Sequence, residues 1–191
     1  LFLNNRELRP GGGFIGTYGI MKVKNAGIQS IMTDNIYNLD SLAEPYLHEK
    51  PPMPLEKYLR VKDWFMRDAN WWPDFPASTE KVLWFYKNER GAEKIDAVIA
   101  ITPSVIEDLL GFLGNITVDG ITFTPENFWQ ELEYQVEFGF YKKGIAFSDR
   151  KDVIGDLGKE LMAKLFKQPL NEYDRLFDLF SAEVKEKQIM L

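Results

Sequence analysis

The sequence predicts a mixed α+β fold, with a central mixed β-sheet, β-hairpins and flanking helices. Three observations lead to this class. The first third is rich in β-branched and aromatic residues interrupted by turn signals, helix-start signals recur after residue 77, and strand-like and helix-like runs alternate between them. We expect residues 1–191 to form one globular domain, with a last helix at 170–187 as its most peripheral part.

The N-terminal third predicts strands. An apolar start at residues 1–3 is followed by a turn, and residues 14–24 mix Ile, Thr, Tyr and Val as strands do. Asn25-Ala26-Gly27 is a short turn signal before a second strand at 28–33, so the two strands are expected to form a hairpin. Residues 35–62 contain four prolines and are expected to be irregular, apart from a short helix from Leu55 to Val61.

The middle of the chain predicts a loop, a helix and a buried strand. Residues 64–76 carry two prolines within an aromatic-rich loop, and Ser78 is a candidate cap for a helix ending near Asn88. The nearly continuous apolar run from Ile95 to Ile101 is typical of a strand buried on both faces.

The C-terminal half predicts helices around one tight hairpin. Asp119-Gly120 between two short β-type runs indicates that hairpin. Four helix starts are expected, two of them with proline in the first turn. They are Thr102-Pro103, Thr124-Pro125, Ser148 before a helix over 149–166, and Asn171 before a helix ending near 187. The aromatic residues in this half are expected to be core residues, namely Phe128, Trp129, Phe138, Phe140 and Tyr141.

Composition excludes several functional classes. The net charge of −6 and the pI near 5 argue against a general nucleic-acid binder. The absence of cysteine removes thiol catalysis and cysteine zinc sites, and the single histidine, His48, is expected in an exposed loop. No run approaches the roughly 20 apolar residues of a membrane span, so any membrane anchor is expected outside this stretch of sequence.

The turn at residues 4–16 is the first candidate site. It contains Arg6, Arg9, Glu7 and a glycine triplet, and it can direct backbone N–H groups and a guanidinium toward an anion. It matches neither a Walker A loop nor a dinucleotide fingerprint, because no Gly-Lys-Ser/Thr and no helix follow. The alternative is a conformationally demanding turn with a structural ion pair, and a glycine triplet more often marks positive φ or a bulge beside a strand.

The aromatic loop is the second candidate. Arg67 and Asp68 can clamp a phosphate and a magnesium ion, or they can pair with other residues and hold the loop in place. The same loop supplies candidates for a ligand groove, although aromatic clusters of this kind more often pack onto the domain's own core. The candidates are Asn70, Trp71, Trp72 and Phe75.

Two further groups of charged residues are candidates. Arg150 and Lys151 stand at a predicted helix start, where a phosphate can bind or where the helix can simply be capped and solvated. Asp34, followed by Asp40 and Glu44, can hold magnesium or act as a general base, although acids are common in loops.

Two stretches resemble a known family. The turn at Asn4–Gly16 and the loop Arg67-Asp68-Ala69-Asn70-Trp71-x-Pro73-Asp74-Phe75-Pro76 are similar to domain-of-unknown-function family 4012 of bacteria. Residues 95–100 and 110–120 belong to the same pattern, and the resemblance extends to about Phe166. The family brings no established activity.

The order of elements also resembles, more distantly, the LytR-CpsA-Psr domain. Those enzymes move a phospho-glycan from a polyprenyl-pyrophosphate carrier to the bacterial cell wall. Glu7 and Arg9 occupy the place of that family's acid and arginine after the first strand, and Asp149-Arg150-Lys151-Asp152 loosely resembles its late helix start. The chain departs from it at Met32-Thr33-Asp34-Asn35 and at Pro10-Gly11-Gly12-Gly13, where several of that family's arginines are missing.

This second resemblance implies a phosphotransferase at the extracellular face of the bacterial membrane or in the cell wall. If the chain is such an enzyme, the candidate residues above would take three roles: phosphate binding by Arg9, Arg67, Arg150 and Lys151, catalysis by Asp34 and Asp68, and Mg²⁺ binding by Asp34, Asp68 and Asp74. The partner would be a lipid-linked glycan or a cell-wall polymer. The alternative is a non-catalytic envelope module that binds glycan or a protein through its aromatic loop.

Overall fold

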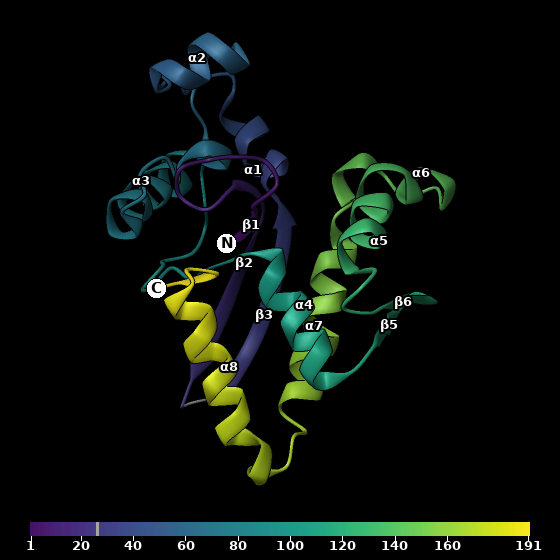
Figure 1. Ribbon diagram of the computed structural model, residues 1–191. Coiled ribbons are helices and arrows are strands. Elements are labelled where there is room, and N and C mark those ends of the chain that lie inside the picture. The colour runs from purple at the N-terminus through teal and green to yellow at the C-terminus, as the bar shows by residue number, and fades with distance from the viewer. Residues whose placement is uncertain (26) are drawn as a thin grey trace.

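The computed structural model describes residues 1–25 and 27–191 (Figure 1). Within these residues a five-stranded mixed sheet has the order β3-β2-β1-β4-β7. Its strands are β1 (Phe2–Asn4), β2 (Phe14–Lys24), β3 (Gly27–Asn35), β4 (Ala100–Ile101) and β7 (Ile189–Met190). β1 pairs with β4 in parallel, and the other neighbours are antiparallel. The predicted mixed α+β fold with a central mixed sheet is therefore confirmed.

The β2–β3 hairpin forms as expected, although Ala26 of its predicted turn lies outside the described residues. The strand expected at 95–101 is wrong for most of its length, because only Ala100 and Ile101 pair in the sheet. The side chain of Ile99 is 43% exposed, so this run is not a strand buried on both faces.

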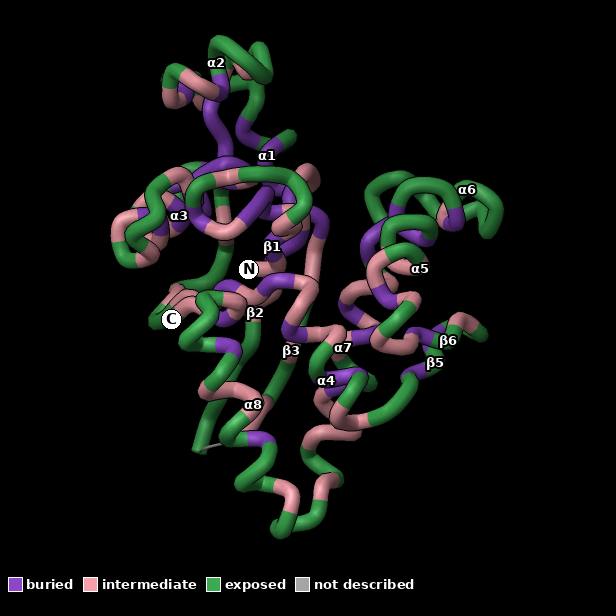
Figure 2. Tube along the Cα trace, viewed as in Figure 1, coloured by how far each residue is buried: buried purple, intermediate pink, exposed green. Residues whose placement is uncertain are grey.

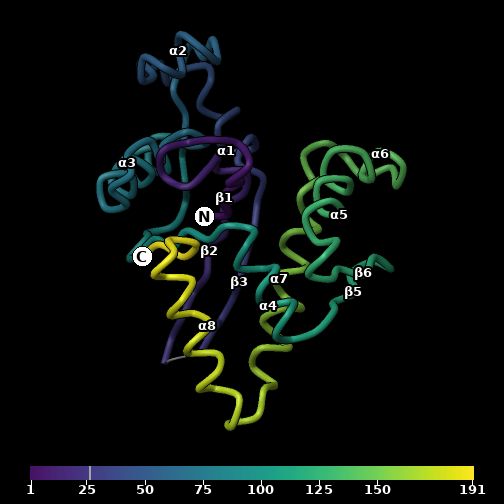
Figure 3. The backbone as a smooth tube through the Cα atoms, viewed as in Figure 1, coloured from purple at the N-terminus to yellow at the C-terminus, as the bar shows by residue number. Residues whose placement is uncertain are grey.

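Helices α1 (Ile36–Ala43), α2 (Met53–Leu59) and α3 (Phe75–Asn88) follow the hairpin, with a short 3₁₀ turn, η1 (Met66–Asp68), before α3. The chain makes these helices before it returns to the sheet through β4 (Figure 3). α1 was not expected, and it begins because the Asn35 side chain accepts a hydrogen bond from the backbone N–H of Tyr37. α3 is capped by Asp74, not by Ser78, whose hydroxyl bonds the backbone of Trp72.

The second half contains α4 (Pro103–Leu113), the hairpin β5 (Ile116–Val118) and β6 (Ile121–Phe123), then α5 (Phe128–Tyr134), a π-helical turn η2 (Gln135–Gly139) and α6 (Phe140–Lys142). Asp119 and Gly120 both have positive φ, as the tight hairpin turn requires. After a 3₁₀ turn, η3 (Phe147–Asp149), helix α7 (Asp152–Leu165) begins three residues later than expected. A last 3₁₀ turn, η4 (Leu170–Glu172), leads into α8 (Tyr173–Lys185).

Two hydrophobic clusters fill the interior. The first joins β1 and β2 to α1, α2 and α3 and contains Ile15, Ile36 and Phe85, all fully buried. The second joins α4, the β5–β6 hairpin, α5 and α7. Figure 2 shows that buried positions concentrate where these elements meet, whereas α6 is exposed. The expectation that Phe138 and Tyr141 are core residues is wrong, since both lie on the surface.

Candidate functional site

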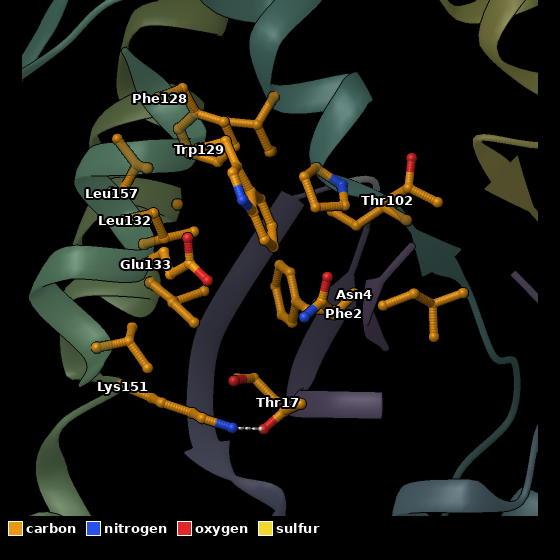
Figure 4. Close-up of a pocket in the computed structure, with 18 of the residues that line it drawn as sticks. Phe2, Asn4, Thr17, Thr102, Phe128, Trp129, Leu132, Glu133, Lys151 and Leu157 are labelled. Carbon is orange, nitrogen blue, oxygen red and sulfur yellow. Dashed lines mark hydrogen bonds between the residues drawn. The ribbon is translucent and has the colours of Figure 1, made fainter. Parts of the chain in front are cut away.

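A cavity of about 280 Å³ lies between the sheet and the helices of the second cluster (Figure 4). Its walls come from β1, β2, the start of α4, the α5–η2 segment and α7. Segments far apart in sequence therefore build it. The volume is close to the lower limit of about 300 Å³ that is common for ligand pockets.

The wall of this cavity is mostly apolar. Phe2 and Trp129 face the cavity from β1 and α5 (Figure 4). The other apolar lining residues are Leu3, Phe14, Ile101, Pro103, Ile106, Phe128, Leu132, Val136, Ile154, Leu157 and Leu161. Gly158 of α7 completes the wall, and a Cβ at this position would meet no atom within 4 Å. The space beside Gly158 is therefore open.

Lys151 lies at one end of the cavity. Its Nζ reaches from the start of α7 to the sheet and donates a hydrogen bond to the backbone oxygen of Gly16 at 2.5 Å (Figure 4). Burial lowers the pKa of Lys151 to about 8, with Arg150 acting in the same direction and Glu137, Glu7 and Asp40 opposing it. A buried ammonium group is thus held at the end of an apolar space.

Carboxylates lie on the exposed rim of the same cavity. Glu7, Glu133 and Glu137 line it and are exposed. Arg150 donates to Glu137 at 2.7 Å and to the backbone oxygen of Val136 at 3.2 Å. The Nε of Arg150 is buried and has no hydrogen-bond partner within the described part of the chain.

Arg9 and Arg67 meet at Asp68. Arg9 Nε lies 2.6 Å from Oδ1 of Asp68, and Arg67 Nε lies 3.8 Å from Oδ2. Arg67 also pairs with the buried carboxylate of Asp40 at 2.9 Å. The turn and the aromatic loop therefore converge, as a phosphate site would need, but both arginines are already paired with carboxylates.

Tyr37 lies between this network and the cavity. The guanidinium of Arg67 and the Nζ of Lys151 each lie 5.5 Å from the centre of the Tyr37 ring. Burial raises the pKa of the Tyr37 hydroxyl, and Arg67 opposes that shift. The cationic groups of Arg67 and Lys151, which are far apart in sequence, are therefore neighbours around one ring.

A buried pair of carboxyl groups extends the network. Burial raises the pKa of Glu89 to about 9 and that of Asp40 to about 6. Oε1 of Glu89 accepts the backbone N–H of Met66, whereas Oε2 of Glu89 and Oδ1 of Asp40 have no donor within the described residues. One proton held between the two carboxyl groups would satisfy both oxygens.

The four residues predicted as a ligand groove lie elsewhere. Asn70 is buried, and its amide donates to the backbone oxygens of Gly11 at 3.1 Å and Gly13 at 2.6 Å. Trp71 and Phe75 pack against the first cluster, and Trp72 lies over Trp64 with ring centroids 5.9 Å apart. The lining of the cavity includes none of the four among the described residues, and their role as ligand contacts stays a prediction.

The acids predicted to bind Mg²⁺ are separated. Asp68 contacts the two arginines, Asp74 caps α3, and Asp34 accepts hydrogen bonds from Tyr18 and Asn38. Across residues 1–25 and 27–191, no group of three or more His, Cys, Asp or Glu side chains is arranged to hold a metal ion. The catalytic assignments to Asp34 and Asp68 also stay predictions, and neither residue lines the cavity.

The sequence did not indicate the apolar part of the site. Trp129 was expected in the core, yet its ring lines the cavity and lies 4.6 Å from the Arg6 guanidinium. No sequence pattern other than helical periodicity distinguished Leu132, Val136 and Gly158 as cavity residues. The predicted helix at 149–166 contains two glycines, Gly155 and Gly158, and a glycine inside a helix often marks a packing or functional requirement; only Gly158 lines the cavity.

The comparisons identify a family. The model of a family described as "Protein of unknown function (DUF4012)" matches residues 1–136, which is most of the chain. Neither the curated proteins nor the solved structures contain a match to this chain. No helix in the described parts of the chain is both long and apolar enough to cross a bilayer. The residues matched include the glycine turn, the aromatic loop and much of the cavity wall, and the chain belongs to the DUF4012 family.

Proposed function

We propose that this chain binds a lipid phosphate of the kind that carries glycans, such as a polyprenyl phosphate or pyrophosphate. The apolar chain would occupy the cavity, and the phosphate would lie beside Lys151. The observation that carries this proposal is the combination of an apolar cavity with one buried ammonium group at its end.

Both halves of such a ligand match the chemistry of the walls. Each CH₂ group moved from water into the cavity contributes about 0.8 kcal/mol. At the other end, Lys151 is mostly protonated at pH 7 because its pKa is about 8, and it can offer its charge to a phosphate. Arg150, whose Nε has no partner in the described residues, is the neighbouring cation.

In the proposal, Mg²⁺ binds at the rim of the cavity and not at the three aspartates expected to hold it. Mg²⁺ usually binds to one or two carboxylates together with phosphate oxygens, so it needs no cluster of three acids. Glu7 and Glu137 both act on the pKa of Lys151 and both line the cavity. In the proposal, an ion held by these two carboxylates would offset their repulsion of the phosphate.

The proposal retains a cell-envelope location, because lipid-linked glycans are found there. It assigns binding of the phospho-glycan carrier to this chain. Transfer of the phospho-glycan to an acceptor would be a further step, detected as release of the lipid monophosphate when the pyrophosphate-linked glycan, Mg²⁺ and an acceptor polymer are supplied.

The test is binding of a fluorescent polyprenyl phosphate to the protein in mild detergent. Lys151→Met removes the charge and keeps an unbranched side chain. Its control is Lys159→Met, which changes an exposed lysine within α7, the helix that Lys151 immediately precedes. A charge-assisted hydrogen bond contributes about 1.5–3 kcal/mol, so Lys151→Met should weaken binding by roughly 10-fold to 150-fold.

The apolar half is tested by filling the cavity. Gly158→Phe places a ring in the open space beside α7, and Gly111→Phe is the control on the exposed face of α4. Binding should be lost in the first variant and retained in the second. Equal binding by wild type, Lys151→Met and Gly158→Phe would refute the proposal.

A further inference from the structure

Residues 138–148 form an exposed turn that we call the basic aromatic tip. The exposed fractions of its large side chains are 63% for Phe138, 82% for Tyr141, 40% for Ile145 and 59% for Phe147. The tip includes α6, which lies at the far end of the α5–α6 arm and is coloured as exposed (Figures 1 and 2). Contiguous exposed apolar side chains of this kind mark interaction sites.

The charge of the tip is opposite to that of the chain. Lys142 and Lys143 are both exposed, and residues 138–148 contain no Asp or Glu, although the chain has 29 acidic residues and a net charge of −6. Aromatic side chains together with lysines are therefore presented in one place. The acids nearest in sequence flank the tip, namely Glu137, which pairs with Arg150, and Asp149, which accepts a hydrogen bond from Ser148.

The tip is an ordered turn. The backbone N–H of Ile145 donates to the oxygen of Phe140 at 2.9 Å, and that of Gly144 donates to Tyr141 at 3.1 Å. The rings of Phe140 and Phe147 pack edge to face with centroids 6.1 Å apart. The preceding π-helical turn is a type of irregularity that is frequent at functional sites.

We propose that the basic aromatic tip docks on the surface of an anionic lipid bilayer. Phe138 and Tyr141 would lie at the level of the headgroups and the first methylenes, where aromatic side chains are enriched. Lys142 and Lys143 would contact lipid phosphates, each strengthening the attraction to an anionic surface.

A protein partner or a second copy of this chain fits the tip less well than a bilayer does. Lysine is depleted from protein–protein interfaces, whereas a bilayer surface accommodates it beside aromatic rings. In a symmetric contact between two copies, the same patch faces itself, so Lys142 and Lys143 of the two copies would repel each other.

The position of the tip connects this inference to the cavity. One residue, Asp149, separates the tip from Arg150 and Lys151, and the tip follows Val136 and Glu137 of the cavity wall. Docking would bring the cationic end of the cavity to the lipid surface. This last step rests on the proposed function, whereas docking itself does not.

The experiment is co-sedimentation of the 191-residue chain with vesicles of phosphatidylcholine alone or with one third phosphatidylglycerol. We expect binding to the anionic vesicles that weakens in 0.5 M salt, since exposed charges are then screened within about 4 Å. Lys142→Glu with Lys143→Glu should reduce partitioning at least 25-fold, since one lysine is worth roughly five-fold. Phe138→Ser with Tyr141→Ser should reduce it about 10-fold or more.

The matched control is Phe177→Ser on α8, which removes a phenylalanine that is 73% exposed but lies outside the tip. It should leave partitioning unchanged, and circular dichroism should show the same fold for all variants. Gly158→Phe should still bind vesicles, which separates docking from lipid-phosphate binding in the cavity. Three results would each overturn the inference. They are a wild-type chain that does not bind vesicles, tip variants that bind as well as the wild type, and a wild-type dimer that the same variants dissociate.

Discussion

At the residue scale, the buried ionic network determines how this molecule responds to pH. Asp40, Asp68 and Glu89 lie with Arg9 and Arg67, so three carboxyl groups accompany two guanidinium groups away from solvent. Buried charges without partners are costly, and burial raises the pKa of both Asp40 and Glu89, so one proton held by this pair would balance the set. These residues hold the turn and the aromatic loop together.

Glu89→Gln is predicted to flatten the dependence of stability on pH. The folded-state pKa of Glu89, about 9, lies above its unfolded value, so the folded chain binds more protons from pH 5 to 9 and stability falls as pH rises. The loss approaches about 1.4 kcal/mol per pH unit for one proton. Gln keeps an oxygen for Met66 and offers an N–H to Asp40, so the variant should lose this slope.

Urea unfolding at pH 5, 7 and 9 measures how the free energy of unfolding depends on pH. Glu160→Gln, an exposed glutamate on α7, should retain the wild-type slope. A Glu89→Gln protein whose stability still falls at the wild-type rate between pH 5 and 9 would contradict the shared proton.

Asn70→Ala is predicted to destabilise the fold by about 2–4 kcal/mol, because the change leaves the backbone oxygens of Gly11 and Gly13 without their buried donor. Asn171→Ala removes an exposed asparagine and should cost less than about 0.5 kcal/mol. Chemical denaturation of both variants makes the comparison. Equal losses would show that Asn70 does not anchor the turn.

At the element scale, two turns that contain glycine differ in what makes glycine necessary. Gly120 in the β5–β6 turn has φ of +77°, and a Cβ there would meet nothing within 4 Å. Gly13 before β2 has φ of +128°, and its Cβ would overlap the backbone oxygen of Asn4. The first position requires only an unusual backbone conformation, whereas the second also requires that no side chain be present.

Gly120→Ala and Gly13→Ala should therefore have unequal costs. The first should lose about 1–2 kcal/mol, the penalty of a left-handed conformation for an L-residue. The second should lose about 3 kcal/mol or more, because strain and a backbone clash add. Thermal unfolding of both proteins tests this, and a Gly13→Ala protein as stable as Gly120→Ala would show that β1 can move away from the turn.

At the scale of the whole molecule, the cavity lies between the sheet and α7, so ligand binding and global stability are linked. A ligand at 100 times its Kd stabilises the folded state by about 2.7 kcal/mol. Gly158→Ala should stabilise the ligand-free protein by about 0.5–1 kcal/mol, because alanine lowers the conformational entropy of the unfolded chain and no atom obstructs its Cβ.

Thermal unfolding with and without polyprenyl phosphate checks both effects. The lipid should raise the Tm of wild type and of Gly111→Phe and leave that of Gly158→Phe unchanged. A lower Tm for ligand-free Gly158→Ala would mean that the space beside α7 is closed in solution.

Elements with strong local signals could be predicted from the sequence. Thr102-Pro103 begins α4 and Asp119-Gly120 forms the hairpin turn, as expected. The start of α7 could not be placed, because a 3₁₀ turn takes up residues 147–149 before the helix. The length of β4 was overestimated because an apolar run indicates burial and not strand pairing.

The sequence by itself determined the fold class, the hairpins, the start of α4 and the absence of cysteine chemistry. These properties follow from local backbone preferences, caps and composition, which act over a few residues. Only the tertiary structure decided that Arg9 meets Asp68, 59 residues away, and that Lys151 reaches Gly16, 135 residues away. The cavity likewise exists only where β1, β2, α5 and α7 come together, because its walls depend on how the elements pack.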